Sequence, residues 1–201
     1  GEEEEEDEEI EPTCPCCRAA GRDPLKKKSK QPPPPRYGGA AAVGSEPIRI
    51  GVLTVSDRAF QGRYDDRGGP EVLRCIHRLI QSSWSSECRI VPDVQTVIEE
   101  ELIDLMDRRG CHVVITTGGT GPSKRDVTPE ATESVCDRMF PGFGEIMRSI
   151  SLKYVPTAML SRQTAGLRND SFVINLPGNP GSIEQILPKV MASVAHCVHL
   201  A

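Results

Sequence analysis

The stretch Ile48-Arg-Ile-Gly-Val-Leu-Thr-Val55 consists mostly of apolar residues, many of them β-branched, and is followed by the polar pair Ser56-Asp57. A short apolar run of this kind is typical of a strand that is buried on both faces of a parallel sheet. It predicts a central strand with polar side chains at its carboxyl end. Ligands of such sheets bind at that end, so Ser56 and Asp57 are the first candidates for a site.

From this strand onward, short apolar runs alternate with helical periods. Three further strands are predicted at residues 88–92, 112–117 and 171–176. Helices are predicted from Pro70, over residues 96–109, from Pro129, over residues 142–154 and 157–164, and at the C-terminus. This alternation predicts an α/β fold with a mostly parallel sheet and helices on both of its faces.

One predicted helix has a specific start and end. Pro129 fits the first turn of a helix, and Thr128 before it has the residue type of an N-cap. This helix is expected to bury Val135 and Met139 and to end at Pro141.

The first 46 residues differ in composition from the rest. They contain almost no large apolar side chains. After Gly1 they have an acidic run at residues 2–9, followed by Lys26-Lys-Lys28 and Pro32-Pro-Pro-Pro35. Such a segment cannot bury enough surface to offset the entropy of ordering it. We therefore expect a disordered tail and linker at residues 1–46, followed by a single domain at residues 47–201.

Charge and hydropathy exclude several classes of protein. Residues 47–201 carry 18 acidic and 17 basic side chains, whereas a nucleic-acid-binding domain is expected to present a basic face. No apolar run is long enough to span a membrane, and the acidic N-terminus does not resemble a secretory signal. The sequence therefore predicts a cytoplasmic protein that binds neither nucleic acid nor membrane.

The cysteines point to a reducing compartment. Five of the eight lie in apolar segments of the domain without close spacing, as expected for reduced cysteines that act as small hydrophobic residues. Cys14, Cys16 and Cys17 lie close together in the tail, but a zinc site needs a fourth ligand and none is near. The four histidines show no metal-binding spacing either.

Three predicted strand ends carry unusual residues, and the fold class brings strand ends together. They are Ser56-Asp57, Gly118-Gly-Thr-Gly121 and Pro177-Gly-Asn-Pro180. The glycine segment forms either a plain tight turn or a loop whose backbone N–H groups hold an anion. Lys124 and Arg125 shortly after it favour the anion, although the spacing matches no nucleotide-binding fingerprint.

Each remaining candidate has two readings. Asp126 is either a turn-forming carboxylate or one beside a phosphate that holds Mg²⁺ or positions a nucleophile. Asp93 either begins a helix or lies in the site. Arg162, after Ser161, is either a surface residue or a fixed fork for phosphate. Asn179 is either a turn residue or a polar contact to a heterocycle.

Six motifs occur in the order seen in the molybdopterin adenylyltransferases, which include the bacterial Mog proteins and the G domain of gephyrin. They are Thr54-Val-Ser-Asp-Arg58, Val91-Pro-Asp93, Thr117-Gly-Gly-Thr-Gly-Pro122, Arg125-Asp-Val-Thr-Pro-Glu-Ala131, Ala158-Met-Leu-Ser-Arg162 and Asn175-Leu-Pro-Gly-Asn-Pro180. The resemblance covers residues 48–199, and six ordered motifs are far more specific than any one of them. Two mild departures are Gly68, where relatives often have Ser, and Val94, where Glu is frequent.

The resemblance implies an enzyme that transfers AMP from ATP to the terminal phosphate of molybdopterin, with Mg²⁺, and releases pyrophosphate. It places the two important aspartates of the family, as catalytic residues and Mg²⁺ ligands, at Asp93 and Asp126. It further implies a homotrimer and a partner domain or protein for molybdenum insertion. The residues that it implies for substrate binding are Gly118, Gly119, Thr120, Gly121, Ser161, Arg162, Pro177, Gly178 and Asn179. Ser56 and Asp57 are added to the substrate-binding candidates because they follow the first predicted strand.

Two other functions compete with the enzyme. The domain could bind molybdopterin without catalysis, as a carrier or scaffold, although the presence of both aspartates favours the enzyme. Alternatively, the tail could recruit protein partners through its acidic, basic and proline segments.

Overall fold

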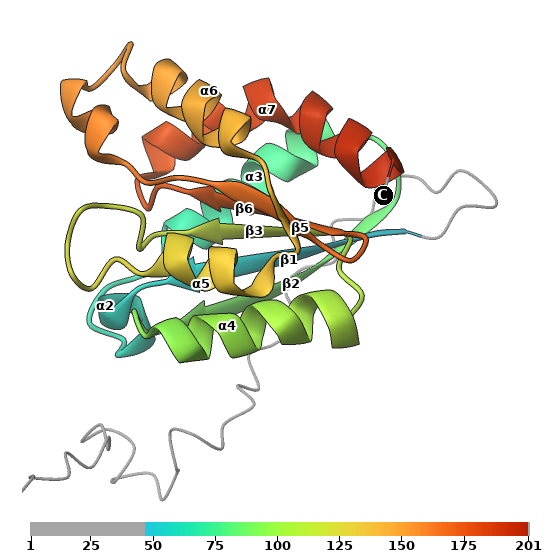
Figure 1. Cartoon of the computed structure of the whole chain (residues 1–201), viewed down its shortest axis with the longest axis horizontal. Coiled ribbons are helices and arrows are strands. Elements are labelled where there is room, and N and C mark those ends of the chain that lie inside the picture. The colour runs from blue at the N-terminus through green and yellow to red at the C-terminus, as the bar shows by residue number, and fades with distance from the viewer. Residues whose placement is uncertain (1–46, 201) are drawn as a thin grey trace, which may run out of the picture. The chain divides into compact units, whose positions relative to one another are not determined.

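The computed structural model describes residues 47–200, so the predicted disordered tail and its three cysteines lie outside the described residues. Six strands form one sheet in the order β2-β1-β3-β6-β5-β4 (Figure 1). The strands are β1 (Ile48–Val55), β2 (Trp84–Val91), β3 (Val113–Thr117), β4 (Arg138–Met139), β5 (Ala165–Arg168) and β6 (Ser171–Leu176). The first four strands of this order are parallel, and β5 and β4 are antiparallel to their neighbours.

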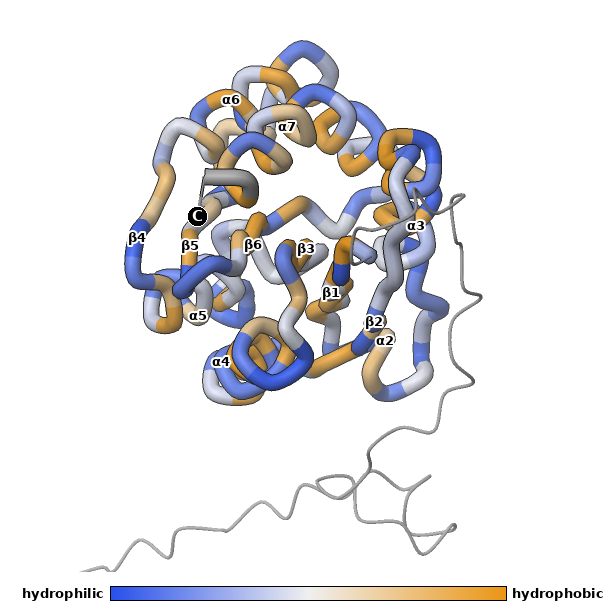
Figure 2. The backbone as a smooth tube through the Cα atoms, turned by 90° about the vertical axis from the view of Figure 1, so that its right-hand side faces the viewer, coloured by the Kyte–Doolittle hydropathy of each residue, from blue (hydrophilic) through white to orange (hydrophobic). Residues whose placement is uncertain are grey.

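Helices cover both faces of the sheet, so the predicted fold class is confirmed. They are α2 (Asp57–Phe60), α3 (Gly68–Leu79), α4 (Gln95–Ile103), the π-helix η1 (Asp104–Arg108), α5 (Thr128–Val135), α6 (Pro141–Ser151), the 3₁₀-helix η2 (Pro156–Leu160) and α7 (Pro180–Leu200). Figure 2 shows the sheet between two helical layers, with α3, α6 and α7 on one side and α4 and α5 on the other.

Each face of the sheet has its own apolar core, because side chains alternate along the buried strands. On β1, Val52 packs in a cluster with residues of α3, α6 and α7. The next residue, Leu53, packs in a second cluster with residues of α4, η1 and α5. Residues 50–55 are therefore all buried, as expected for a strand covered on both faces.

The strand register aligns the carboxyl ends of the parallel strands. Val55 pairs with Val91 at the end of β2, and Thr54 pairs with Thr117 at the end of β3. Thr117 pairs in turn with Leu176 at the end of β6. The loops after β1, β2, β3 and β6 therefore leave the sheet at one edge, where ligands of parallel sheets bind.

The predicted helix over residues 157–164 is wrong. Only Pro156–Leu160 is helical, as the short η2, and the chain then enters β5. β5 and β6 form a hairpin in which Arg168 pairs with Ser171, so Asn169 and Asp170 make a two-residue turn. Asn169 has a φ of 49°, the left-handed conformation that such turns need and that Asn tolerates.

The helix that begins near Pro129 is shorter than predicted. It ends at Val135, and Met139 lies on the edge strand β4, opposite Gly166. Pro141 is the first residue of α6, because its missing N–H and fixed φ suit that position. Thr128 lies inside the helix rather than capping it, and its hydroxyl instead donates to Gly118 O.

The short helix α2 was not predicted. Ser56 caps it by accepting a hydrogen bond from Ala59 N. No helix within residues 47–200 is long and apolar enough to cross a membrane. The cytoplasmic location stays a prediction.

Candidate functional site

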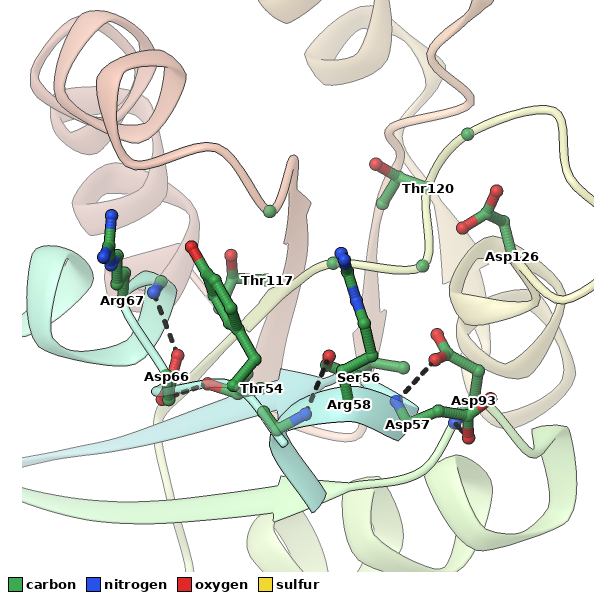
Figure 3. Close-up of a pocket in the computed structure, with 18 of the residues that line it drawn as sticks. Thr54, Ser56, Asp57, Arg58, Asp66, Arg67, Asp93, Thr117, Thr120 and Asp126 are labelled. Carbon is green, nitrogen blue, oxygen red and sulfur yellow. Dashed lines mark hydrogen bonds between the residues drawn. The ribbon is translucent and has the colours of Figure 1, made fainter. Parts of the chain in front are cut away.

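A cavity of about 510 Å³ lies at the edge of the sheet where the parallel strands end. Its walls come from the ends of β1 and β3 and from the loops that follow β1, β2, β3 and β6 (Figure 3). The lining residues are Thr54, Val55, Ser56, Asp57, Arg58, Ala59, Tyr64, Asp66, Arg67, Gly68, Asp93, Thr117, Gly118, Gly119, Thr120, Gly121, Asp126, Gly178 and Pro180. The three strand ends predicted to converge therefore do so.

The glycine loop after β3 has a backbone that requires its glycines. Gly118 and Gly119 have φ values of 99° and 62°, where side chains are strained. A Cβ on Gly118 would also overlap Val55 O, and one on Gly119 would overlap the Thr128 hydroxyl. A plain tight turn would account for the glycines, but it would not account for the hydrogen bonds that the loop makes.

All four carbonyl groups of the glycine loop are bound to the protein. Gly118 O accepts from the Thr128 hydroxyl at 2.9 Å, and Gly119 O accepts from Thr128 N at 3.1 Å. Thr120 O and Gly121 O accept from Arg162, through its backbone N at 2.8 Å and its Nε at 2.9 Å. Among residues 47–200, the N–H groups of Gly119, Thr120 and Gly121 have no acceptor. A loop that lines a cavity with its carbonyls tied back and its amides free is suited to an anion.

Asp57 and Asp93 lock the loops after β1 and β2 together. Asp57 N donates to Asp93 Oδ2 at 2.7 Å, and Asp93 N donates to Asp57 Oδ1 at 3.1 Å. Arg125 pairs with the other oxygen of Asp57 at 2.5 Å. Asp93 therefore does not begin a helix through its side chain, and the N-cap of α4 is Val94, without a side-chain hydrogen bond.

Asp93 is the carboxylate whose protonation is most affected by this site. Its partial burial raises its pKa above the ordinary value, and the negative charges of Asp57 and Asp126 raise it further. The hydrogen bond from Asp57 N and the charge of Arg125 oppose this shift without cancelling it. The negative charges of Asp57 and Asp126 thus act on Asp93, although these three carboxylates do not form a group that could hold a metal ion by themselves.

Asp126 has both a turn-forming role and access to the cavity. Its Oδ2 accepts from Ser123 N at 2.9 Å, which shapes the loop after the glycines. The residue also lines the cavity, and Figure 3 shows it on the same side as Asp93. The two readings of Asp126 are therefore compatible.

Ser161 and Arg162 do not line this cavity. Besides its two bonds to the glycine loop, Arg162 donates through Nη2 to Asp126 O and pairs with Glu130. Its guanidinium therefore fixes the loop that carries the free amides, from outside the cavity. This geometry gives Arg162 a positioning role, and direct binding of phosphate by Ser161 or Arg162 stays a prediction.

The segment after β6 borders the cavity directly beside the glycine loop, since a Cβ on Gly178 would lie 3.4 Å from Gly118 Cα. Thr117 donates to Pro177 O at 3.0 Å, and Gly178 lines the cavity. Asn179 instead accepts from Gly181 N at 2.9 Å and caps the start of α7 with its carbonyl. Asn179 does not line the cavity, so the structure favours its reading as a turn residue. Pro177 does not line the cavity either.

The part of the site that lies between β1 and α3 was not predicted from the sequence. Arg58, Tyr64 and Arg67 line the cavity there, and Asp66 holds the start of α3 by accepting from Gly68 N and Gly69 N. The available signal was the order Asp66-Arg-Gly-Gly-Pro70, in which a carboxylate precedes the first free amides of a helix.

Comparisons with known proteins agree with this geometry. The family described as "Probable molybdopterin binding domain" matches residues 51–196. The molybdopterin adenylyltransferase of Helicobacter pylori strain 26695 is 50% identical over 155 residues, which cover 77% of this chain and 88% of that protein. The molybdopterin adenylyltransferase of Escherichia coli K12 is 46% identical over 165 residues, covering 76% and 85%.

A solved structure supports the same relationship. The crystal structure of the molybdopterin biosynthesis enzyme MoaB from Thermus thermophilus has a TM-score of 0.70 and 36% identity to this chain. The match covers 76% of this chain and 95% of that one.

Proposed function

This chain belongs to the molybdopterin adenylyltransferase family of molybdenum cofactor biosynthesis, and from that premise we propose that it transfers AMP from ATP to the terminal phosphate of molybdopterin. In this reaction a phosphate oxygen of molybdopterin forms a bond to the α-phosphorus of ATP. The bond from that phosphorus to the bridging oxygen breaks, and the oxygen leaves with the electron pair as part of pyrophosphate.

The observation that carries this proposal is the hydrogen bonding of the glycine loop. Joining two polyanions requires that their repulsion be offset, and most of the catalysis in such transfers is positioning and electrostatic stabilisation. The amides of Gly119, Thr120 and Gly121 are free for phosphate oxygens, while Arg162 and Thr128 fix their directions. A preorganised set of donors stabilises developing negative charge without having to reorganise.

The carboxylates fit the Mg²⁺ ion that the resemblance implies. Mg²⁺ in nucleotide sites is bound by one or two carboxylates together with substrate phosphates, and Asp93 and Asp126 both line the cavity. We propose that Asp93 and Asp126 hold it. When bound, Mg²⁺ would neutralise phosphate charge at the reacting centre. No group of three or more possible metal ligands occurs among residues 47–200, which is consistent with phosphates completing the coordination.

A direct assay tests the proposed reaction. The full chain is incubated with molybdopterin, ATP and Mg²⁺, and adenylated molybdopterin and pyrophosphate are measured. We expect the two products to appear in equal amounts. Molybdopterin binding without either product would instead identify a carrier or scaffold domain.

A substitution of Asp126 tests its part in turnover. We expect Asp126→Asn to lower turnover at least roughly a hundredfold, because the amide cannot supply the negative charge, while most molybdopterin affinity is retained. Asp170→Asn, in the exposed turn between β5 and β6, is the matched control. Equal activity of Asp126→Asn and the parent protein would remove Asp126 from the mechanism.

We also propose that the protein is a homotrimer, as the resemblance implies. Six large apolar side chains are exposed along α6, η2 and the segment that joins them, which is unusual for a surface that stays in water. They are Ile146, Leu152, Tyr154, Val155, Met159 and Leu160. We likewise propose a partner domain or protein for molybdenum insertion, as the resemblance implies.

A further inference from the structure

The cavity contains two arginines that have no role in the proposed reaction so far. Arg58 on α2 and Arg67 just before α3 both line it, as does Tyr64 on the loop between them. The guanidinium carbon of Arg58 lies 5.5 Å from the centre of the Tyr64 ring, and that of Arg67 lies 5.4 Å from it. One aromatic ring therefore positions two arginines through cation–π contacts.

Neither arginine is neutralised by the described part of the protein. No ion pair within residues 47–200 involves Arg58 or Arg67. Asp66 is next to Arg67 in sequence, but its Oδ1 accepts from Gly68 N and Gly69 N, and its Oδ2 accepts from the Thr54 hydroxyl at 2.8 Å. Two positive charges thus share one half-exposed ring beside a cavity, and an anion bound between them would relieve their repulsion.

The charges of the cavity are unevenly distributed. Asp93 and Asp126 lie away from Arg67, and both oxygens of Asp66, the carboxylate beside Arg67, accept hydrogen bonds from the Thr54 hydroxyl and from Gly68 N and Gly69 N. Figure 3 shows Asp93 and Asp126 on one side of the drawn pocket and Arg67 on the other, with Arg58 between them in this view. A ligand that fits has a cation near the carboxylates and a separate group of negative charge near the arginines.

We propose that Arg58 and Arg67, held on Tyr64, form the subsite for the β- and γ-phosphates of ATP and for the pyrophosphate that leaves. This inference rests on the proposed adenylyl transfer. When the bond from the α-phosphorus to the bridging oxygen breaks, that oxygen keeps the electron pair and pyrophosphate gains negative charge. Two planar guanidinium groups, each able to donate two parallel hydrogen bonds, are suited to stabilise that charge.

The terminal phosphate of molybdopterin offers the same chemistry as pyrophosphate, so the test separates the two sources. Binding of pyrophosphate, AMP and molybdopterin to the full chain is measured by calorimetry at a fixed Mg²⁺ concentration. The variants are Arg58→Gln, Arg67→Gln and the double variant. Arg63→Gln is the matched control, because Arg63 is exposed on the same loop and does not line the cavity.

We expect each single variant to bind pyrophosphate about tenfold more weakly and the double variant about a hundredfold, with AMP and molybdopterin affinities changed by less than twofold. Tyr64→Leu should weaken pyrophosphate binding by removing the ring that holds both arginines, whereas Tyr64→Phe, which keeps a ring, should not. Circular dichroism establishes that each variant is folded.

Three results would overturn the subsite. The first is that the parent protein does not bind pyrophosphate at millimolar concentration. The second is that the arginine variants lose no more pyrophosphate affinity than Arg63→Gln does. The third is that they lose as much affinity for AMP or molybdopterin as for pyrophosphate. A different result would contradict the proposed function. If the parent protein binds pyrophosphate through these arginines but makes no adenylated molybdopterin, the subsite is supported and the adenylyl transfer is not.

Discussion

Asp93 is held in an environment that is unfavourable for its charge. Its pKa is raised above the ordinary value near 3.8 by partial burial and by the neighbouring carboxylates. A carboxyl group with a raised pKa in the folded state stabilises the fold only when protonated, so its contribution is lost as the pH rises through the folded-state pKa. At neutral pH the charged form of Asp93 therefore lowers the free energy of unfolding.

Substituting Asp93 tests this balance between stability and activity. We expect Asp93→Asn to raise the midpoint of thermal unfolding at pH 7, because the amide oxygen can still accept from Asp57 N and carries no charge. The difference from the parent protein should shrink as the pH falls toward 3.8. Turnover should fall roughly a hundredfold in the adenylation assay. An unfolding midpoint at pH 7 below that of the parent would contradict the electrostatic explanation.

Arg162 provides a second test at the scale of single residues. If it acts by holding the glycine loop, Arg162→Lys should lower turnover about tenfold or more, because one ammonium group cannot bind Gly121 O, Asp126 O and Glu130 together. Glu130→Gln should then lower turnover as well, since it loosens the arginine. If Arg162 instead bound substrate phosphate directly, Glu130→Gln would free the arginine and substrate affinity would rise. Steady-state kinetics of both variants separates the two roles.

At the scale of elements, the sequence predicted the buried strands well and the antiparallel edge poorly. Residues 171–176 were predicted to the residue, because six successive residues, mostly apolar, are bounded by Asp170 and Pro177. β5 was missed because Ala165-Gly-Leu-Arg168 lacks β-branched residues and follows a stretch with helical spacing. The pairing of β5 with β6 depends on the turn at Asn169, and only two residues of the sequence, Asn169 and Asp170, indicate that turn.

The turn at Asn169 can be tested through stability. We expect Asn169→Val to lower the free energy of unfolding by about 1–3 kcal/mol, because a β-branched residue is strained at a φ of 49°. Asn169→Gly is the matched control, since glycine adopts this conformation without strain. Urea unfolding of both variants provides the comparison. Equal losses would show that the Asn side chain, and not the backbone, determines stability at this turn.

The sequence predicted those parts of the candidate site that follow the ends of the parallel strands. Asp93, Asp126 and the glycine loop meet as expected, because parallel strands end at one edge. The arginines around Tyr64 were not predictable in the same way, since the loop between β1 and α3 has no periodicity. The position of Arg162 outside the cavity also depends on contacts with a loop about 40 residues earlier in the sequence.

At the scale of the whole molecule, the exposed apolar side chains of α6 and η2 are the basis of the proposed homotrimer. We expect Met159→Glu, at a side chain that is 66% exposed, to reduce the sedimentation coefficient from that of a trimer to that of a monomer. Phe60→Glu is the control, because Phe60 is also exposed but lies on α2. A trimer that persists in Met159→Glu would place the interface elsewhere on the surface.

The position of β1 inside the sheet has a consequence for synthesis on the ribosome. β1 is the first strand of the described part, yet its neighbours are β2 and β3, and β3 in turn needs β6 on its other side. The nascent segment Ile48–Val55 therefore has no partner strand until residue 91 has emerged and lacks its second partner until residue 117 has emerged, and the parallel core cannot close before residue 176. Strands that wait for distant partners fold slowly and are exposed to aggregation. Destabilising substitutions in β6 should therefore reduce the yield of folded protein in cells more than their effect on the finished fold would suggest.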